Sequence, residues 1–466
     1  MSGRVHMIGI GGIGMSALAK VLLARGVSVS GSDVQASPLA RGLSDLGAIV
    51  TIGHEASRVE GAGRVVISDA IHEDNPELRR ARELGLLVTR RSGLLAELMA
   101  DRRGIAVSGT HGKTTVTAMV GLILMEAGMS PTVVLGGEYE AFGGNARVGV
   151  GEWMVVEACE AYESYLDLAP EIAVITNIEP DHLDHHKTEA HLRESFGRFL
   201  GNITPGGWAV LCADREELTT LGEGSGRGTV TYGLAAGARV RGAEAHVTGS
   251  SSRCRLLVDG ADKGDLRVPV PGIHNLVNAL GATAAALKAG APVEACQAAL
   301  AGFAGVGRRF EVLGDANGIT IVDDYAHHPT EIEATIAAAR AAYPGRRLVA
   351  VFQPHLYSRT RDFADGFARA LEAADVIVLV GIYPAREDPL PGVTSSLIGE
   401  PLRRRKGKDA VFEMAKHDVV ETLPKLTRPG DVVLAMGAGD IGDAARDLAV
   451  RLGARTPSAA PPVATK

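Results

Sequence analysis

Residues 104–115 are Gly104-Ile105-Ala106-Val107-Ser108-Gly109-Thr110-His111-Gly112-Lys113-Thr114-Thr115, an apolar segment that runs directly into a glycine-rich turn. The apolar part is typical of a buried strand, and the residues from Lys113 to about Gly128 have the pattern of a helix. Strand, turn with Gly-Lys-Thr and helix are the parts of a P-loop, although Val107 stands where the full pattern has a glycine. In such a loop backbone amides hold phosphates, the lysine reaches the β- and γ-phosphates, and the following hydroxyl binds Mg²⁺. The stretch therefore predicts ATP binding by residues 109–115, with Lys113 as a catalytic group and Thr114 as a metal ligand; a chance Gly-Lys-Thr is the alternative.

Acidic and imidazole side chains follow two further apolar segments. Glu157 ends the segment 153–156, and residues 177–186, which include His182, follow the segment 173–176. Because the carboxyl ends of parallel strands face the ligand crevice in an open α/β sheet, these side chains could complete a magnesium site beside the P-loop. The alternative is a solvated loop rich in Asp and His.

A second glycine turn lies close to the start of the chain, at Gly9-Ile10-Gly11-Gly12-Ile13-Gly14. It fits the pattern G-x-G-x-x-G between a strand and a helix, and Asp33 follows at the end of the next expected strand. Such a turn brings amides and a helix N-terminus against a diphosphate. Alone, the pattern points to NAD or FAD with Asp33 on the ribose; a turn that only packs helix on strand is the alternative. The sequence predicts a diphosphate and leaves the nucleotide open.

Strand and helix patterns alternate along most of the 466 residues, which predicts an α/β protein with parallel sheets. We expect a Rossmann-like domain at 1–100, a central P-loop ATPase-like domain at 101–309 with a β insertion near 222–269, a Rossmann-like C-terminal domain at 310–454, and a disordered tail at 455–466. The expected first-domain elements are strands at 5–10, 27–30, 64–68 and 86–89 and helices at 12–25, 38–46 and 76–84. In the last domain we expect strands at 319–323, 347–352, 375–379 and 431–435.

Composition excludes several classes of protein. Glycine is unusually frequent, at 58 of 466 residues or about 12% against a typical ~7%. This frequency favours a protein in which the backbone often approaches a ligand or another segment closely. A net charge of −7 and 4% aromatic residues argue against a general nucleic-acid or membrane binder. The four cysteines form no CxxC pair, so a zinc ribbon is excluded and reduced thiols are expected. With no apolar run of transmembrane length and no signal-peptide pattern, we expect a cytoplasmic protein.

Taken together, the motifs resemble those of the Mur ligase family, the ATP-dependent amide ligases of peptidoglycan precursor synthesis. The resemblance covers nearly the whole chain and rests on motifs in family order: the two glycine turns, Asn177-Ile178-Glu179-Pro180-Asp181-His182, Gly272-Ile273-His274-Asn275, Arg308-Arg309-Phe310-Glu311, Asp323-Asp324-Tyr325-Ala326-His327-His328-Pro329, Phe352-Gln353-Pro354-His355 and Met436-Gly437-Ala438-Gly439-Asp440.

The resemblance implies roles for individual residues. The first glycine turn would hold the diphosphate of a UDP-sugar rather than a dinucleotide, with contacts from Gly11, Gly12, Ile13, Gly14, Ser32, Asp33 and Ser68. Mg²⁺ would be held by Thr114, Glu157 and His182, and ATP by the P-loop with His274, Asn275, Asn278, Arg309 and Asp324. Catalytic roles would fall to Lys113, His327, His328 and Arg359. Asn275 could instead cap a helix, and the double histidine before Pro329 could simply mark a helix start.

Within the family, the chain most resembles the members that join L-alanine to the lactyl carboxylate of UDP-N-acetylmuramate through an acyl phosphate. The segment 191–200 lacks the lysine that other members carry there, and Leu356 stands where some have an arginine. We expect UDP-N-acetylmuramate and L-alanine as substrates, ATP and Mg²⁺ as cofactors, and a monomer or weak homodimer. The alternatives are a recycling ligase that joins a tripeptide to the same UDP-sugar, an NAD(P)-dependent oxidoreductase, and a nucleotide-gated binding module without chemistry.

Overall fold

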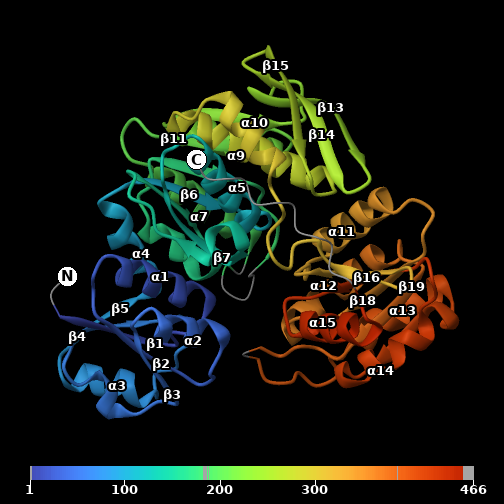
Figure 1. The fold of residues 1–466 in the computed structure, drawn as a ribbon, viewed down its shortest axis with the longest axis horizontal. Helices are drawn as coiled ribbons and strands as arrows, with labels where there is room; N and C mark the ends of the chain where they lie inside the picture. The colour runs from blue at the N-terminus through green and yellow to red at the C-terminus, as the bar shows by residue number, and fades with distance from the viewer. Residues whose placement is uncertain (1–2, 182–185, 187, 386, 455–466) are drawn as a thin grey trace. The chain divides into compact units, whose positions relative to one another are not determined.

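The computed structural model describes residues 3–181, 186, 188–385 and 387–454 and contains three β-sheets with helices packed against them (Figure 1). Contacts divide the chain into two compact units, which are described separately. The first unit runs to Ala243 and adds Leu256–Gly264 and Val277–Leu300; the second holds Glu244–Arg255, Asp265–Leu276 and the chain from Ala301 onward. The predicted α/β class is confirmed, whereas the boundaries near residues 100 and 310 remain a prediction. His182 and the 455–466 segment lie outside the described residues.

The first sheet has the strand order β3-β2-β1-β4-β5, and every pair in it is parallel. The order reverses between β1 and β4, which is the topological switch point of a doubly wound sheet. Two of its helices begin with a proline that follows a capping residue, Ser37 or Asn75. Its elements are β1 (Arg4–Ile8), α1 (Ile13–Ala24), β2 (Val29–Asp33), α2 (Pro38–Asp45), β3 (Ile49–Ile52), η1 (Ala56–Val59), β4 (Ala62–Ile67), α3 (Pro76–Glu83), β5 (Leu87–Arg90) and α4 (Arg91–Ala100).

The second sheet has the order β15-β14-β13-β12-β11-β10-β6-β9-β7-β8 and carries the P-loop strand β6 in its interior. Strands β13, β14 and β15 extend it as the glycine-rich β insertion expected near 222–269. Its elements are β6 (Arg103–Ser108), α5 (Lys113–Glu126), β7 (Thr132–Tyr139), η2 (Glu140–Phe142), β8 (Gly144–Arg147), β9 (Trp153–Glu157), η3 (Ala161–Asp167), β10 (Ile172–Ile175), α7 (Glu189–Gly201), β11 (Trp208–Cys212), α8 (Glu216–Gly224), β12 (Gly228–Gly233), β13 (Val240–Thr248), β14 (Ser251–Val258), β15 (Ala261–Val268), α9 (Ile273–Ala289) and α10 (Val293–Ala301).

The third sheet has the order β16-β17-β21-β18-β19-β20, with only β16 antiparallel to its neighbour. Its elements are β16 (Glu311–Ala316), β17 (Ile319–Asp324), α11 (Pro329–Ala342), β18 (Leu348–Phe352), α12 (Tyr357–Leu371), β19 (Val376–Val380), α13 (Ser396–Lys406), η4 (Lys408–Ala410), β20 (Val411–Met414), α14 (Lys416–Leu426), β21 (Val432–Met436) and α15 (Ile441–Leu452).

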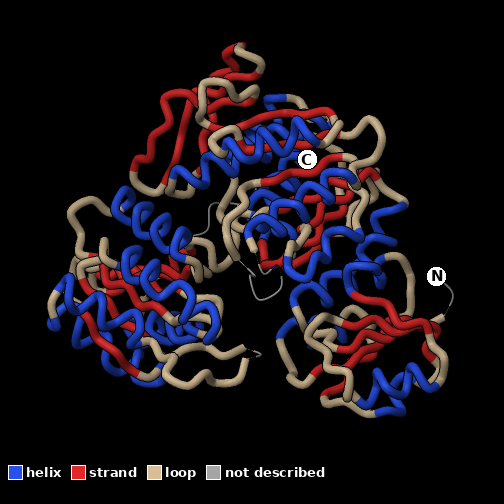
Figure 2. The backbone as a smooth tube through the Cα atoms, turned by 180° about the vertical axis from the view of Figure 1, so that it is seen from behind, coloured by secondary structure: helices blue, strands red, loops and turns tan. Residues whose placement is uncertain are grey.

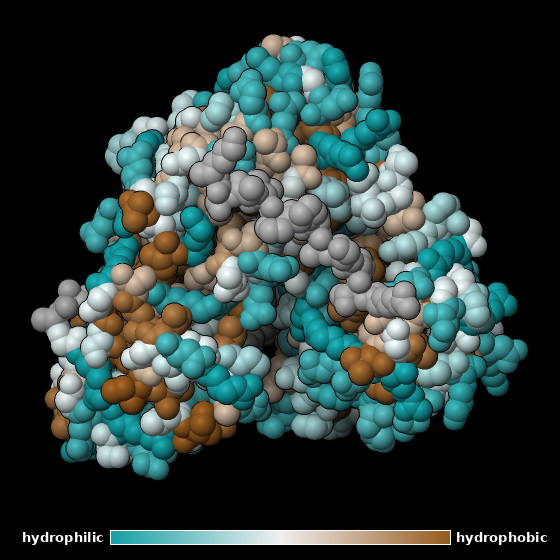
Figure 3. All heavy atoms as spheres, in the orientation of Figure 1, coloured by the Kyte–Doolittle hydropathy of each residue, from teal (hydrophilic) through white to brown (hydrophobic). Residues whose placement is uncertain are grey.

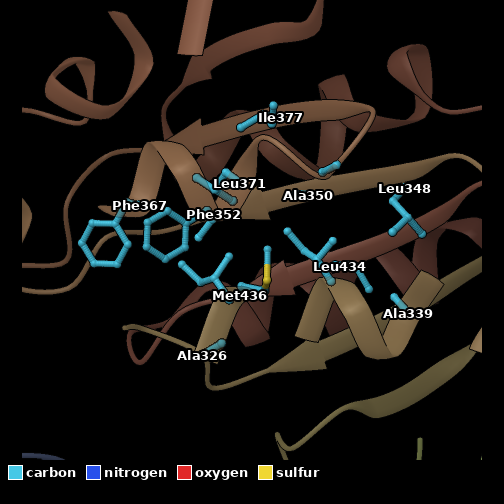
Figure 4. Packing of buried hydrophobic residues seen from close by; sticks show 14 of the residues in the cluster. Ala326, Ala339, Leu348, Ala350, Phe352, Phe367, Leu371, Ile377, Leu434 and Met436 are labelled. Atoms are coloured by element: carbon cyan, nitrogen blue, oxygen red, sulfur yellow. The ribbon is translucent and has the colours of Figure 1, made fainter. Parts of the chain in front are cut away.

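Strand β18 explains why this sheet is covered on both faces. Its five residues are all buried, and successive side chains enter different cores: Leu348, Ala350 and Phe352 join one cluster, Val349 and Val351 the other. In the first cluster the ring of Phe352 lies beside that of Phe367, with centroids 5.1 Å apart (Figure 4). A continuous apolar run of this kind is what a strand buried on both faces requires.

Helices flank the strands of each sheet (Figure 2). Large apolar side chains are exposed near the β3 edge of the first sheet, at Val34, Leu46, Ile49 and Ile52. On the face shown in Figure 3, most of the strongly apolar residues in view lie over the part of the chain that forms this sheet. In the described part of the chain every helix is too short or too polar to cross a membrane.

Candidate nucleotide and sugar-nucleotide sites

The P-loop lies at the carboxyl edge of the second sheet, between the two strands that carry the predicted acidic segments. β6 is parallel to β10 on one side, with Ser108 opposite Ile175, and to β9 on the other, with Val107 opposite Glu157. Gly109 has φ +126°, and a Cβ there would lie 2.1 Å from Thr176 Oγ1, so only glycine fits. The turn predicted from the sequence is therefore present, and its neighbours are the residues that follow β9 and β10.

The segment after β10 is bonded to the P-loop at several points. Asn177 accepts from the amides of Thr110 (3.1 Å, through its carbonyl) and His111 (2.9 Å, through Oδ1), and its Nδ2 donates to His111 O at 3.1 Å. Thr110 Oγ1 donates to Glu179 O and accepts from Glu179 N. The amides of Thr110 and His111 therefore donate within the protein. The first amides of α5 have no intrahelical acceptor, and this end of a helix is where an anion binds.

Lys113, the first residue of α5, is held by its own loop and by a buried carboxylate. Its Nζ donates to Gly109 O (2.6 Å) and Thr110 O (3.1 Å) and lies 2.9 Å from Glu160 Oε2. Burial would lower the pKa of Lys113, but the charge and hydrogen bond of Glu160, together with the charges of Cys159 and Glu157, outweigh burial and raise the pKa above its usual value. The lysine therefore stays cationic. Glu160 was not predicted, because it follows β9 in a segment without a local motif.

The predicted metal ligands are partly assembled. Thr114 is buried in the first turn of α5, and Glu157 ends the adjacent β9, where Oε1 accepts from Gly136 N at 2.6 Å. A hydroxyl and a carboxylate are the hard oxygen donors that Mg²⁺ prefers, so these two residues fit that ion. Asn278 joins this region from α9, since a Cβ on Gly112 would lie 2.7 Å from Asn278 Oδ1.

The first glycine turn is anchored by β2. The amides of Gly9 and Ile10 donate to Ser32 O at 2.8 and 3.0 Å, and Gly11 N donates to Asp33 Oδ2 at 2.9 Å. Ser68 also reaches this turn, because a Cβ on Gly9 would lie 3.4 Å from Ser68 Oγ. The predicted residues Ser32, Asp33 and Ser68 are thus brought together around the turn.

Arg91 lies against the first glycine turn and was not predicted. A Cβ on Gly14 would lie 3.1 Å from Arg91 Cδ and 3.3 Å from its NH1, so the first residue of α4 places a guanidinium beside the start of α1. A guanidinium suits an anion such as a diphosphate. The sequence holds no local signal for this contact, because 77 residues separate Arg91 from Gly14.

In the second unit, Asp324 ends β17 and accepts two backbone hydrogen bonds. The amides of Phe310 and Ala326 donate to it at 2.9 Å, and Thr335 Oγ1 lies 3.2 Å away. Burial raises the pKa of Asp324 to about 6, against the opposing charge of Arg309. Arg309 itself lies over the ring of Tyr325, 4.9 Å from its centroid.

The two histidines after β17 differ in their bonds. His327 Nδ1 lies 2.9 Å from Tyr325 O and 3.2 Å from Glu331 Oε2; both oxygens are acceptors, so Nδ1 carries the proton. His328 is the N-cap of α11: its Nδ1 accepts from Thr330 N at 3.4 Å, with Glu331 completing a capping box. The helix-start interpretation therefore holds for His328.

Arg359 and His355 lie together on the neighbouring segment of the second unit. Arg359 is buried in the first turn of α12, with NH1 3.4 Å from His355 Nδ1. The ring of His355 stacks on Tyr383 and meets that of His327 edge to face, with centroids 6.0 Å apart. Two of the predicted catalytic residues, His327 and Arg359, thus contact the same imidazole.

The turn before α9 carries the remaining predicted ATP contacts. His274 lies at the exposed start of α9, and partial desolvation of its ring lowers its pKa to about 4, which favours the neutral form. Asn275 Nδ2 donates to Pro271 O at 2.8 Å, and α9 begins at Ile273. The helix-capping alternative for Asn275 is wrong, because its side chain donates from inside the first turn instead of accepting ahead of it.

Known proteins that are similar to this chain in sequence and fold define its class. Models of three Mur ligase domains match in order: the catalytic domain of the Mur ligase family at residues 4–103, the Mur ligase middle domain at 107–286 and the Mur ligase glutamate ligase domain at 308–439. These matches cover most of the chain and coincide with its three sheets. The chain belongs to the Mur ligase family.

Relatives narrow the resemblance further. The chain is 45% identical to a UDP-N-acetylmuramate–L-alanine ligase from Sorangium cellulosum, over 97% of both chains, and 44% identical to one from Geobacter sp., over 96% of this chain and 97% of that one. The crystal structure of UDP-N-acetylmuramate–alanine ligase from Thermotoga maritima has a TM-score of 0.82 at 29% identity, covering 97% and 99% of the two chains. A murein peptide ligase from Psychrobacter arcticus shares the fold, with a TM-score of 0.72 at 24% identity and the same coverage.

Proposed function

We propose that this chain joins L-alanine to the lactyl carboxylate of UDP-N-acetylmuramate, with conversion of ATP to ADP and phosphate, in peptidoglycan precursor synthesis. The supporting observation is identity of 43–46% over nearly the whole chain with ligases of that name, together with a P-loop whose lysine is held in place. The reaction needs no membrane and is assigned to the cytoplasm, with the protein acting as a monomer or weak homodimer.

The chemistry begins with activation of a poor acyl donor. The lactyl carboxylate attacks the γ-phosphorus of ATP, the bond to the β,γ-bridging oxygen breaks, and an acyl phosphate and ADP result. Both reactants are anions, so catalysis depends on positive charge and positioning. The permanently charged Lys113, the amides at the start of α5 and Arg309 are assigned to the phosphates. Mg²⁺, when bound by Thr114, Glu157 and His182, would supply further neutralisation of phosphate charge.

Binding of the nucleoside is assigned to His274, Asn275 and Asn278. Asp324 is assigned to hold the loops of the second unit that carry Arg309. A neutral His274 suits a contact with an uncharged base or ribose, and its low pKa keeps it in that form. Asp324 is assigned an organising role through the amides of Phe310 and Ala326.

The second half of the reaction is attack by the amine of L-alanine on the acyl phosphate, followed by expulsion of phosphate. The attacking nitrogen must lose protons, and an imidazole near neutral pH can accept one. The hydrogen bonds favour His327 as this base: its Nδ1 carries the proton, so its Nε2 has the lone pair. His328 uses Nδ1 as a helix cap, and Arg359 is assigned to an anionic group of the substrates.

The test is the mass of the product formed from UDP-N-acetylmuramate, ATP and a mixture of amino acids with the murein tripeptide. We expect a single product heavier by one alanyl residue, with one phosphate released for each amide bond formed. A tripeptide adduct would instead assign the chain to recycling. ATP binding without any adduct would overturn the ligase assignment.

A further inference from the structure

A fully buried carboxylate lies beneath the carboxyl edge of the first sheet, away from every residue assigned a role above except Ser32. Glu77 is the second residue of α3, and its side chain is 0% exposed. Its Oε2 accepts from Ser32 Oγ at 2.6 Å and lies 3.0 Å from His6 Nε2. Burial alone would raise the pKa of Glu77, but the bonds from His6 and Ser32 outweigh burial and lower it. An ionised carboxylate in such a place has to be compensated by its neighbours.

The same carboxylate fixes His54 from three directions. Ser32 spends its only hydroxyl proton on Glu77, so its oxygen must accept from His54 Nδ1, which lies 3.0 Å away. Glu77 Oε1 accepts from the backbone amide of Glu55 at 3.2 Å and lies 3.5 Å from His54 Nδ1. The proton of a neutral His54 is therefore on Nδ1, and the lone pair is on Nε2.

His54 stands next to the first glycine turn and reaches solvent. It follows β3, and Gly53 N donates to the carbonyl of Asp33, whose carboxylate accepts from Gly11 N. The His54 side chain is 17% exposed, whereas that of Glu77 is sealed. Nδ1 of His54 is thus held by groups inside the domain. Nε2 lies on the other side of the ring, at the edge of the sheet where a sugar nucleotide is proposed to bind.

We propose that Glu77 is a positioning residue of the sugar-nucleotide site, which holds His54 with Nε2 as a hydrogen-bond acceptor for a hydroxyl or imide N–H of the UDP-sugar. The inference rests on the proposed function, because it assumes that UDP-N-acetylmuramate binds at this edge. Glu77 itself does not touch the substrate; it acts through Ser32 and His54.

The test compares E77Q, H54A and the double variant in steady-state kinetics of the full-length enzyme. We expect each single variant to raise KM for UDP-N-acetylmuramate about tenfold, with kcat and KM for ATP changed by less than about twofold. Since both changes remove one interaction, the double variant should be no worse than about twofold beyond H54A. If the effects of E77Q and H54A on KM multiply fully in the double variant, Glu77 has no positioning role. The same conclusion follows if E77Q leaves KM unchanged while H54A raises it.

Two controls keep the outcomes distinct. E97Q weakens the bidentate pair between Arg64 of β4 and Glu97 of α4 and should lower Tm without changing KM for the UDP-sugar. If E77Q does not fold, S32A removes the hydroxyl relay and should give the same KM rise. G11A tests the site itself, since its Cβ would lie 2.8 Å from Ser37 Oγ. If G11A and H54A both leave KM unchanged, the proposed site is wrong; if only E77Q does, the positioning inference is wrong.

3-Methyl-UDP, 2′-deoxy-UDP and 3′-deoxy-UDP, used as inhibitors, identify the donor. The analogue that lacks the donor bound by His54 should inhibit wild type about tenfold less than UDP does, and H54A should abolish that difference. Equal inhibition of the wild type by UDP and all three analogues would overturn the acceptor role of Nε2.

Discussion

The two glycine turns of the first unit share a layout but differ in how charge is supplied. Each follows a central strand and precedes a helix, and each is anchored by a neighbouring strand: the turn at 9–14 by the last residues of β2, and the P-loop by the segment after β10. In the P-loop the anchor is the neutral amide of Asn177 and the cation is Lys113, which belongs to the loop. In the turn at 9–14 the anchor is the carboxylate of Asp33, and the cation is Arg91 from a distant helix. The same backbone geometry therefore makes one anion site whose cation belongs to the loop itself and one whose cation comes from a distant helix.

The largest effect is expected from Lys113, because its charge is part of the P-loop and has no substitute there. K113A should lower kcat/KM for ATP by at least about a thousandfold, since phosphoryl transfer depends on electrostatic stabilisation. Binding of UDP-N-acetylmuramate, measured by calorimetry, should stay within about twofold because the other turn is untouched. K288A, which removes an ammonium that lies over the Trp208 ring in the same unit, is the matched control. Near-normal turnover of K113A would refute the P-loop assignment.

The next effect tests the anchor of the P-loop. N177A removes the acceptor of His111 N and the donor to His111 O, so the loop loses two of its ties. We expect kcat/KM for ATP to fall by about ten- to a hundredfold and unfolding free energy to fall by about 1–3 kcal/mol. ATP titrations and urea denaturation measure the two. An unchanged ATP affinity would mean that the anchor serves only folding.

A smaller effect is expected at Arg91, the cation that a distant helix supplies to the first glycine turn. R91A should raise KM for UDP-N-acetylmuramate by about tenfold, because a charged hydrogen bond to the diphosphate is lost. KM for ATP should not change. R90A is the control, since the adjacent side chain is 69% exposed and pairs with Asp69 at 3.7 Å. If both variants behave like wild type, the first turn holds its anion with amides alone.

This difference between the turns also decides what could be predicted from sequence. Lys113 and the glycines around it are contiguous, so strand, turn and helix were all predicted and are present. The strands β3, β7 and β8 and the helix α4 were not predicted, because β3 and β8 are only four residues long, β7 contains two glycines, and α4 begins directly after β5. Arg91, Glu160 and Glu77 reach their sites only through tertiary folding, across separations of tens of residues that no local pattern encodes.

A third glycine turn extends the comparison, with the smallest expected effect. Gly272 precedes α9 with φ +110°, and a Cβ there would lie 2.5 Å from His274 Cε1, so a neutral imidazole at the exposed start of α9 takes the place that a charged group has at the other turns. Desolvation of the ring lowers the pKa of His274 from 6.5 to about 4. The unfolded chain therefore binds the proton more tightly than the folded one. The stabilisation is complete above pH 6.5 and is lost as pH falls toward 4.

Between pH 7 and pH 5 this group should lower the unfolding free energy by less than about 1 kcal/mol, because solvent at the exposed ring screens much of the effect of the lowered pKa. H274Q cannot titrate, so the difference between wild type and H274Q should shrink by that amount over the same interval, as measured by urea denaturation at both pH values. Comparing the two proteins at each pH cancels the titration of all other groups. Parallel pH dependences would show that folding does not lower the pKa of His274 and that the third turn is not the neutral counterpart of the other two.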